Sequence, residues 1–183
     1  MKAIDILVKE HDSILSMIEI IRKIFTGSED KTAINIGHVE MVVDFIRNFA
    51  DKYHHLKEED VLFAEMEKFG MPREGGPIGV MLMEHDEGRA YVRNTIEAIE
   101  RFKNGDLSAL AEMENNLMNY GLLLTNHIHK ENHILYPMAE KFLPIDVLKT
   151  MGEDFEKANS ETIDNEYFDK YLKIAEDLGK IYL

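Results

Sequence analysis

Two stretches of the chain repeat one order of side chains that can bind a metal ion, YHHLKEEDVLF at 53–63 and NHIHKENHILY at 126–136. In each stretch a histidine precedes a glutamate by four positions, as His54 and Glu58 and as His127 and Glu131. On a helix, such a pair lies on one face, about 6 Å apart along the axis at 1.5 Å per residue. An imidazole and a carboxylate at this separation suit a pair of metal ions better than a single ion.

A second pair of stretches supports an internal repeat, KEHDSIL around His11 and MEHDEGR around His85. The offset between these histidines is 85 − 11 = 74 positions, and that between His54 and His127 is 127 − 54 = 73. The near-equal offsets indicate that a first pair of helices is duplicated as a second pair.

Apolar residues recur at three- and four-residue steps almost throughout the chain, which predicts an all-α protein. Breaks occur where Gly, Pro, Asn and Ser cluster, so we expect helices at about 3–25, 32–69, 77–103, 107–142, 145–158 and 164–181. Four long amphipathic helices with short connections favour an up-and-down four-helix bundle over residues 1–143. We expect residues 144–183 to form a helical extension packed on the bundle, with a homodimer surface as the alternative.

Each of the four long helices carries one histidine within its apolar stripe, and two of them also carry a glutamate. The six inward groups are His11, His54, Glu58, His85, His127 and Glu131. Burying a polar group without a partner costs roughly 1 to 3 kcal/mol by mutation, and an isolated carboxylate costs more. A metal centre compensates this cost. If both glutamates bridge two ions about 3.5 to 4 Å apart, each ion receives two oxygens and two histidine nitrogens.

Other polar residues compete for this assignment. His55 with Glu59 is the closest rival to His54 with Glu58, although the row of His55 predicts a solvated face. Tyr120 lies on the inward stripe and could donate a hydrogen bond near the centre. We expect His129 and His133 on the outer face, in a row that includes Tyr136, and a structural role for His38.

The composition restricts the kinds of metal ligand and of binding partner. The sequence contains no cysteine, so thiolate ligands and disulfides are excluded and any metal must bind to nitrogen and oxygen. Such ligands suit iron or manganese, and zinc also fits. Thirty-five acidic residues against 21 Lys and Arg give a net charge of −14, which disfavours nucleic acid and anionic membranes. No uninterrupted apolar segment indicates a signal peptide or a membrane span, so we expect a cytoplasmic protein.

Four motifs occur in the order of a known family: EHD at 10–12, HHLKEEDVLF at 54–63, EHDEGR at 84–89 and HIHKENHILYPMA at 127–139. Over about residues 1–142 the chain resembles the hemerythrin-like HHE cation-binding domains of bacteria and archaea. The resemblance implies a four-helix bundle around a non-haem di-iron centre. It also implies terminal histidine ligands and two bridging carboxylates, His11, His54, His85, His127, Glu58 and Glu131.

Departures from the oxygen-carrying members bear on function. Those proteins have two histidines four apart on the third helix, whereas Met81 and Arg89 stand four positions either side of His85. They also have His-x4-Asp on the fourth helix, where this chain has His127 and Glu131. These differences favour the sensing or reactive branch of the family. Iron-centre repair proteins share the four-histidine, two-glutamate pattern but carry a cysteine-containing segment that this sequence lacks.

The leading hypothesis is therefore a di-iron module that binds or senses a diatomic ligand, oxygen or nitric oxide, and is a binding protein more than an enzyme. An open metal position facing a small apolar cavity suits such a ligand. The alternatives are a di-iron oxidoreductase that reduces peroxide or nitric oxide, an iron storage or iron-centre repair protein, and a structural zinc site.

Overall fold

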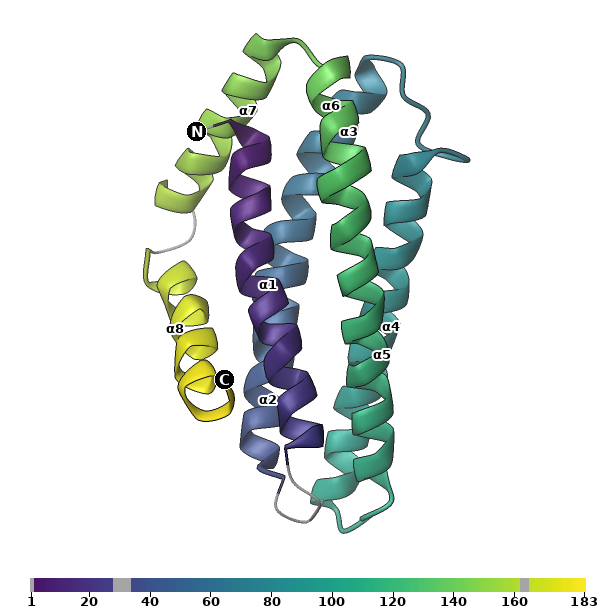
Figure 1. Ribbon diagram of the computed structural model, residues 1–183, viewed down its shortest axis with the longest axis vertical. Helices are drawn as coiled ribbons and strands as arrows, with labels where there is room; N and C mark the ends of the chain where they lie inside the picture. Colours follow the sequence, from purple (N-terminus) through teal and green to yellow (C-terminus); the bar gives the residue numbers. More distant parts are fainter. Residues whose placement is uncertain (1, 28–33, 162–164) are drawn as a thin grey trace.

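The computed structural model describes the backbone of residues 2–27, 34–161 and 165–183 and the side chains of residues 2–27, 34–157 and 168–183. Over these residues all regular secondary structure is helical, as the sequence predicts. Four long helices run up and down beside one another, and two shorter helices follow along one flank (Figure 1). The all-α four-helix bundle with additional C-terminal helices is confirmed.

The four bundle helices correspond closely to those expected. The first is α1 (Ala3–Thr26), and the third is α4 (Pro77–Lys103). The second runs without a break through α2 (Ile36–Phe45), the π-helical η2 (Ile46–His55) and η3 (Glu58–Leu62), and α3 (Phe63–Lys68). The fourth comprises α5 (Ala109–Lys130), the π-helical η4 (Glu131–Leu135) and α6 (Tyr136–Phe142). The predicted starts at residues 32 and 164 lie outside the described residues.

The turns between helices lie where glycine and proline predict them. Gly70 (φ 101°) and Gly105 (φ 97°) follow the second and third helices in the left-handed conformation, which glycine adopts without steric cost. Pro77 occupies the first turn of α4, where the missing N–H has no intrahelical partner to lose.

The bundle interior has two apolar clusters with a polar layer between them. Along α1, Leu7 belongs to one cluster and Ile14 to the other, and the fully buried His11 lies between them. The second helix repeats this order, with Phe49 and Leu62 on either side of His54 and Glu58. The apolar clusters thus isolate the polar layer from water at both ends of the bundle.

The C-terminal helices α7 (Ile145–Glu161) and α8 (Asn165–Tyr182) pack on the bundle next to α1 (Figure 1). Phe155 of α7 and Leu178 of α8 are buried in the two apolar clusters. His38 bonds through Nδ1 to the Tyr182 hydroxyl at 2.6 Å, which links α2 to the end of α8 and gives His38 a structural role. The division of the chain at residue 143 stays a prediction.

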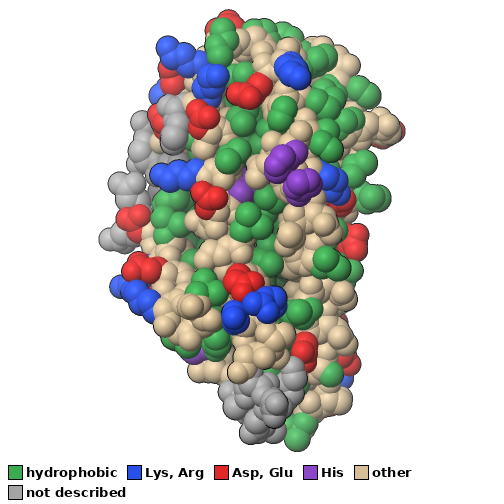
Figure 2. All heavy atoms as spheres, in the orientation of Figure 1, with side chains coloured by type: hydrophobic (Ala, Val, Ile, Leu, Met, Phe, Trp, Pro, Cys, Tyr) green, Lys and Arg blue, Asp and Glu red, His purple; other side chains and the backbone are tan. Residues whose placement is uncertain are grey.

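The outer face of the fourth helix is solvated around His129 and His133. On the face shown in Figure 2, acidic and basic side chains are interspersed among hydrophobic ones, and histidine side chains are also visible. His129 and His133 are exposed, with ring centroids 4.2 Å apart, so their predicted position on the outer face is confirmed.

The packing of α7 on the bundle predicts a large effect of Phe155→Ala. Phe155 is 2% exposed, so its truncation should lower the free energy of unfolding by about 3 to 5 kcal/mol. The matched control is Phe142→Ala, because Phe142 is 42% exposed and should cost about 1 kcal/mol or less. Urea denaturation followed by circular dichroism measures both values, and equal effects would contradict this packing.

Candidate metal centre

The π-helical segments determine which side chains face the interior. His54 and His55 are neighbours in sequence, yet they are 1% and 4% exposed. A π-helix has i to i+5 hydrogen bonds and more residues per turn than an α-helix, so successive side chains are rotated by a smaller angle. Within η2 both imidazoles therefore face inward. The prediction that His55 lies on a solvated face is wrong, because it assumed a uniform period of 3.6 residues.

A first group of ligand atoms lies between α1, the second helix and the fourth helix. Its members are His11, His54, Glu58 and Glu131, and all are at most 1% exposed. The Nε2 atoms of His11 and His54 are 3.0 Å apart. His11 Nε2 is 3.2 Å from Glu131 Oε2, and His54 Nε2 is 3.6 Å from Glu58 Oε2. One cation can contact all four side chains.

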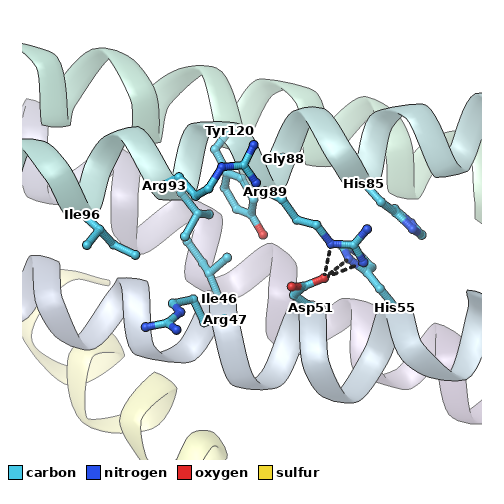
Figure 3. A pocket seen from close by; sticks show the side chains of 11 residues that line it. Ile46, Arg47, Asp51, His55, His85, Gly88, Arg89, Arg93, Ile96 and Tyr120 are labelled. Atoms are coloured by element: carbon cyan, nitrogen blue, oxygen red, sulfur yellow. Dashed lines mark hydrogen bonds and ion pairs between the residues drawn. The ribbon is translucent and has the colours of Figure 1, made fainter.

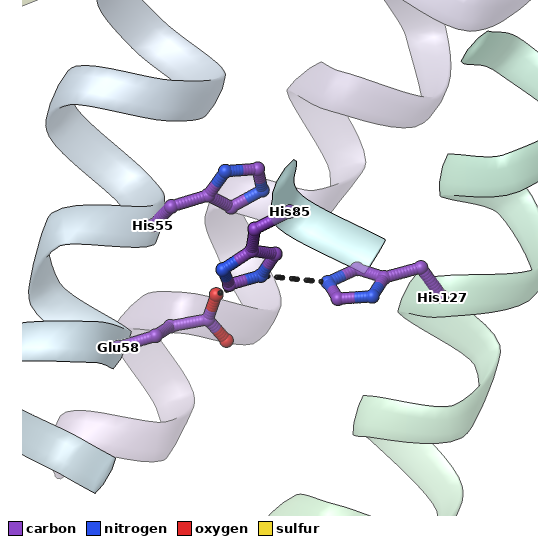
Figure 4. A group of neighbouring side chains, drawn as sticks. All are labelled: His55, Glu58, His85 and His127. Atoms are coloured by element: carbon purple, nitrogen blue, oxygen red, sulfur yellow. Dashed lines mark hydrogen bonds and ion pairs between the residues drawn. The ribbon is translucent and has the colours of Figure 1, made fainter. Parts of the chain in front are cut away.

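A second group contains His55, Glu58, His85 and His127 (Figure 4). The Nε2 atoms of His85 and His127 are 3.0 Å apart, and His85 Nε2 is 3.5 Å from Glu58 Oε2. His127 Nε2 is 3.0 Å from Glu131 Oε1. The His55 ring stacks on the His85 ring with centroids 3.8 Å apart. Both glutamates thus lie between the two groups, as bridging carboxylates would.

In the four inward histidines that the sequence predicted, the outer nitrogen Nδ1 is fixed by an oxygen atom from a neighbouring helix. The four bonds join His11 to Asn132 (2.9 Å), His54 to Glu10 (2.9 Å), His85 to Glu59 (2.7 Å) and His127 to Glu84 (2.8 Å). An oxygen acceptor keeps the ring proton on Nδ1, so the lone pair of the neutral imidazole is on Nε2. All four lone pairs are then directed into the polar layer, which is the arrangement of metal-binding histidines.

These outer contacts follow the internal repeat. Glu84 stands 84 − 10 = 74 positions after Glu10, and each glutamate also forms an ion pair with a lysine. Those lysines, Lys57 and Lys130, are 130 − 57 = 73 positions apart. The duplicated sequence therefore repeats the residues that orient the histidines as well as the histidines themselves.

The buried groups fit a pair of cations. Two imidazole Nε2 atoms face each other at 3.0 Å in each group, and in the neutral rings their lone pairs repel unless a cation, either a metal ion or a proton on one ring, lies between them. Glu58 Oε2 and both carboxylate oxygens of Glu131 accept no hydrogen bond from the described residues. Unpaired buried carboxylate oxygens are costly. Cations between the nitrogens and these oxygens remove both penalties, and the nitrogen and oxygen donors suit iron, manganese or zinc.

Burial and mutual charge separate the pKa values of the bridging glutamates. Burial raises the pKa of Glu58 well above its usual value, and the charge of Glu131 raises it further. Burial also acts to raise the pKa of Glu131, but the neighbouring His127 and His11 outweigh it, and the value falls well below usual. Burial opposes the charged form of His127, yet the Glu131 carboxylate raises its pKa to about 9. Without metal, burial thus favours the protonated form of Glu58, and the Glu131 carboxylate favours the protonated form of His127.

Tyr136 is a residue of the centre that the sequence argument missed. Its hydroxyl donates to Glu58 Oε1 at 2.6 Å, and its ring is stacked on the His11 ring. We expected Tyr136 in the outer row of His129, which is wrong because the π-helical η4 lies between them and changes the period. The internal repeat indicated an aromatic residue at this position of the centre. Phe63 stands 136 − 63 = 73 positions earlier, in the equivalent place, and stacks on His85.

Comparison with protein families agrees with this geometry. The model of the hemerythrin HHE cation-binding domain matches residues 2–139. The chain belongs to this family. The HHE domain spans all four bundle helices and both ligand groups, and it ends before α7. No curated protein and no solved structure matched the chain. Among the described helices, none is both long enough and apolar enough to cross a bilayer.

The protonation of the HHE centre predicts that metal binding releases protons. Metal ligands bind in their deprotonated form, and the pKa values of both Glu58 and His127 are raised, so we expect metal binding at pH 7 to release protons. For each proton released, the apparent affinity for metal falls about tenfold per unit fall in pH. The contribution of His127 to this dependence should disappear above about pH 9, because His127 is then already deprotonated before metal binds. Calorimetric titration with Zn²⁺ in buffers of different ionisation enthalpy counts the protons. An affinity that is constant between pH 6 and 8 would contradict the assignment.

Proposed function

We propose that this HHE protein holds a non-haem di-iron centre and binds or senses a diatomic ligand, oxygen or nitric oxide. The proposed terminal ligands are His11, His54, His85 and His127, with Glu58 and Glu131 as bridges. The observation that carries the proposal is the convergence of four imidazole lone pairs on carboxylate oxygens that accept no hydrogen bond from the described residues. A cytoplasmic location and a homodimer remain predictions.

His55 extends the proposed ligand set. It belongs to the second group of ligand atoms, and its Nε2 has no hydrogen-bond partner among the described side chains. The chain lacks the third-helix histidine pair of oxygen carriers, but the second helix supplies this additional imidazole through the π-helical η2. We propose that His55 makes the two metal positions unequal, with three histidines at the second and two at the first.

The residues around such a centre have defined roles. A bound iron pair would supply redox-active positions for a small ligand. Hydrogen bonds to Glu10, Glu59, Glu84 and Asn132 hold the imidazole rings in orientation, which keeps metal affinity high. The apolar clusters above and below separate the polar layer from water along the axis of the bundle. Tyr136 holds a proton on its hydroxyl, directed at the Glu58 carboxylate.

Tyr136 is the observation that favours a second candidate function, a di-iron oxidoreductase acting on peroxide or nitric oxide. Reduction of either molecule consumes protons, and the Tyr136 hydroxyl lies 3.4 Å from His11 Nε2 as well as bonding to Glu58. General acids contribute when they lie within hydrogen-bond reach of the reacting groups. Turnover with an added reductant separates this function from simple binding, and Tyr136→Phe should then lower the turnover rate about 100-fold or more.

Metal analysis of variants tests the ligand set. Protein purified without added metal should contain close to two iron ions per chain, because two ligand groups are present. His85→Ala should lose one ion, since it removes a nitrogen from the second group. The matched control is His129→Ala, which removes an exposed imidazole and should keep both ions. About one ion, or zinc alone, in the unmodified protein would contradict a di-iron centre, and uptake far beyond two would indicate storage.

Optical spectroscopy tests the ligand. During anaerobic reduction and re-exposure to air or nitric oxide, a ferric pair should gain and lose charge-transfer absorption that zinc cannot give. Reversible changes with one ligand per centre support binding or sensing, whereas a spectrum that is unchanged by both gases would refute it.

A further inference from the structure

A pocket of about 390 Å³ opens between the second helix and α4, beside the second ligand group (Figure 3). His55, His85 and Tyr120 lie at its inner end, and Ile46 and Val92 form part of its apolar wall. The sequence argument assumed a cavity for a diatomic molecule only. A pocket of this volume with apolar walls and a few polar groups is instead the size of a small organic ligand.

Polar atoms at the inner end of the pocket lack partners. Tyr120 is 3% exposed, and its hydroxyl makes no hydrogen bond to any described residue. In Figure 3 this hydroxyl points into the space between α4 and the second helix. A buried hydroxyl is destabilising unless it is paired. Tyr120 therefore presents a hydrogen-bond donor that a ligand oxygen can accept.

The pocket also carries positive charge in a strongly acidic chain. Arg47 and Arg93 line it with exposed side chains, and no ion pair is found for either within the described part of the chain. Arg89, which also lines the pocket, is already paired with Asp51 at 2.8 Å and with Glu59 at 2.7 Å. The net charge of the chain is −14, so two uncompensated guanidinium groups at one pocket distinguish it from the rest of the surface. Guanidinium groups match carboxylate oxygens in geometry.

The internal repeat shows that the fold does not require this pocket. In the other half of the internal repeat, the position equivalent to Gly88 is 88 − 74 = 14, where the buried Ile14 stands. The position equivalent to His55 is 55 + 73 = 128, where the buried Ile128 stands. Branched apolar side chains thus replace the pocket residues in the other half of the bundle. Packing does not demand glycine at 88 either, because an added Cβ would meet the Tyr120 ring at an ordinary 3.5 Å. Glycine within a helix is destabilising relative to alanine.

We infer that this pocket binds a small organic carboxylate. Arg47 and Arg93 attract its charged group, the Tyr120 hydroxyl donates to one of its oxygen atoms, and Ile46 and Val92 contact its apolar body. The site is independent of the identity of the metal, and a bound carboxylate occupies the space next to His55 and His85.

Calorimetric titration of the intact 183-residue chain with benzoate tests the inference. One benzoate should bind per chain, at least tenfold more tightly than benzyl alcohol, which lacks the charge, or phosphate, which lacks the apolar body. Metal-free and zinc-loaded protein should both bind it. No saturable binding, equal binding of phosphate, or binding only after metal loading would each overturn the inference, the last because the carboxylate would then be a metal ligand.

Variants locate the binding site. Arg47→Gln and Arg93→Gln should each weaken benzoate binding about tenfold, since a hydrogen bond to a charged group is lost. Arg22→Gln is the control, because it removes the same charge from an exposed arginine paired with Glu19 on α1. Equal weakening by the control would overturn the site. Metal content should stay at that of the unmodified protein in all three variants.

Substitutions at the inner end separate binding from folding. Tyr120→Phe should weaken benzoate binding several-fold, whereas Tyr53→Phe, which also removes a buried hydroxyl with no hydrogen bond to described residues, should not. Gly88→Ala should weaken binding while raising the melting temperature by about 2 to 4 °C, because it narrows the pocket and favours the helix. Unchanged binding by both Tyr120→Phe and Gly88→Ala would refute the assignment.

Discussion

The polar layer in the middle of the bundle is the constraint on which the other features depend. Imidazoles and carboxylates are buried there between two apolar clusters, and neither kind of group tolerates burial without partners. The outer nitrogens satisfy this demand through bonds between helices, and the inner nitrogens and carboxylate oxygens are left directed at one another. Cations complete the arrangement. Stability of the bundle and affinity for metal are therefore two aspects of one interaction.

The sequence predicted most of this arrangement because its pattern is redundant. A period near 3.6 residues and an internal repeat both assigned His11, His54, His85 and His127 to the interior, and all are about 1% exposed. The predictions that failed concern the orientation of side chains in two short segments. Where the backbone changes to a π-helix, at η2 and η4, a uniform period gave the wrong orientation for His55 and Tyr136. A single sequence shows no mark of that change, since hydrogen-bond register depends on contacts between helices.

The oxygen atoms that orient the histidines could not be predicted from the sequence, for a different reason. Glu59 and Glu84 lie beside residues that sequence reasoning placed inward, and acidic residues in such positions are ordinarily solvated. Only the relative placement of the helices shows that Glu84 reaches His127 and that Glu59 reaches His85. Likewise the sequence placed Tyr120 inward but left its role open, and only the structure shows that it lines the pocket beside the centre. Contacts across the bundle, unlike faces along a helix, cannot be read from periodicity.

The bonds to the histidine outer nitrogens form a closed circuit around the bundle. The first helix bonds to the fourth, the second to the first, the third to the second and the fourth to the third, each through one imidazole. Neither half of the duplicated chain can close this circuit alone. Two copies of the first hairpin could, because Glu59 already occupies the place that Asn132 takes in the second half. The circuit is thus one that a symmetric dimer of helical hairpins could also form, and the duplicated chain closes it within a single molecule.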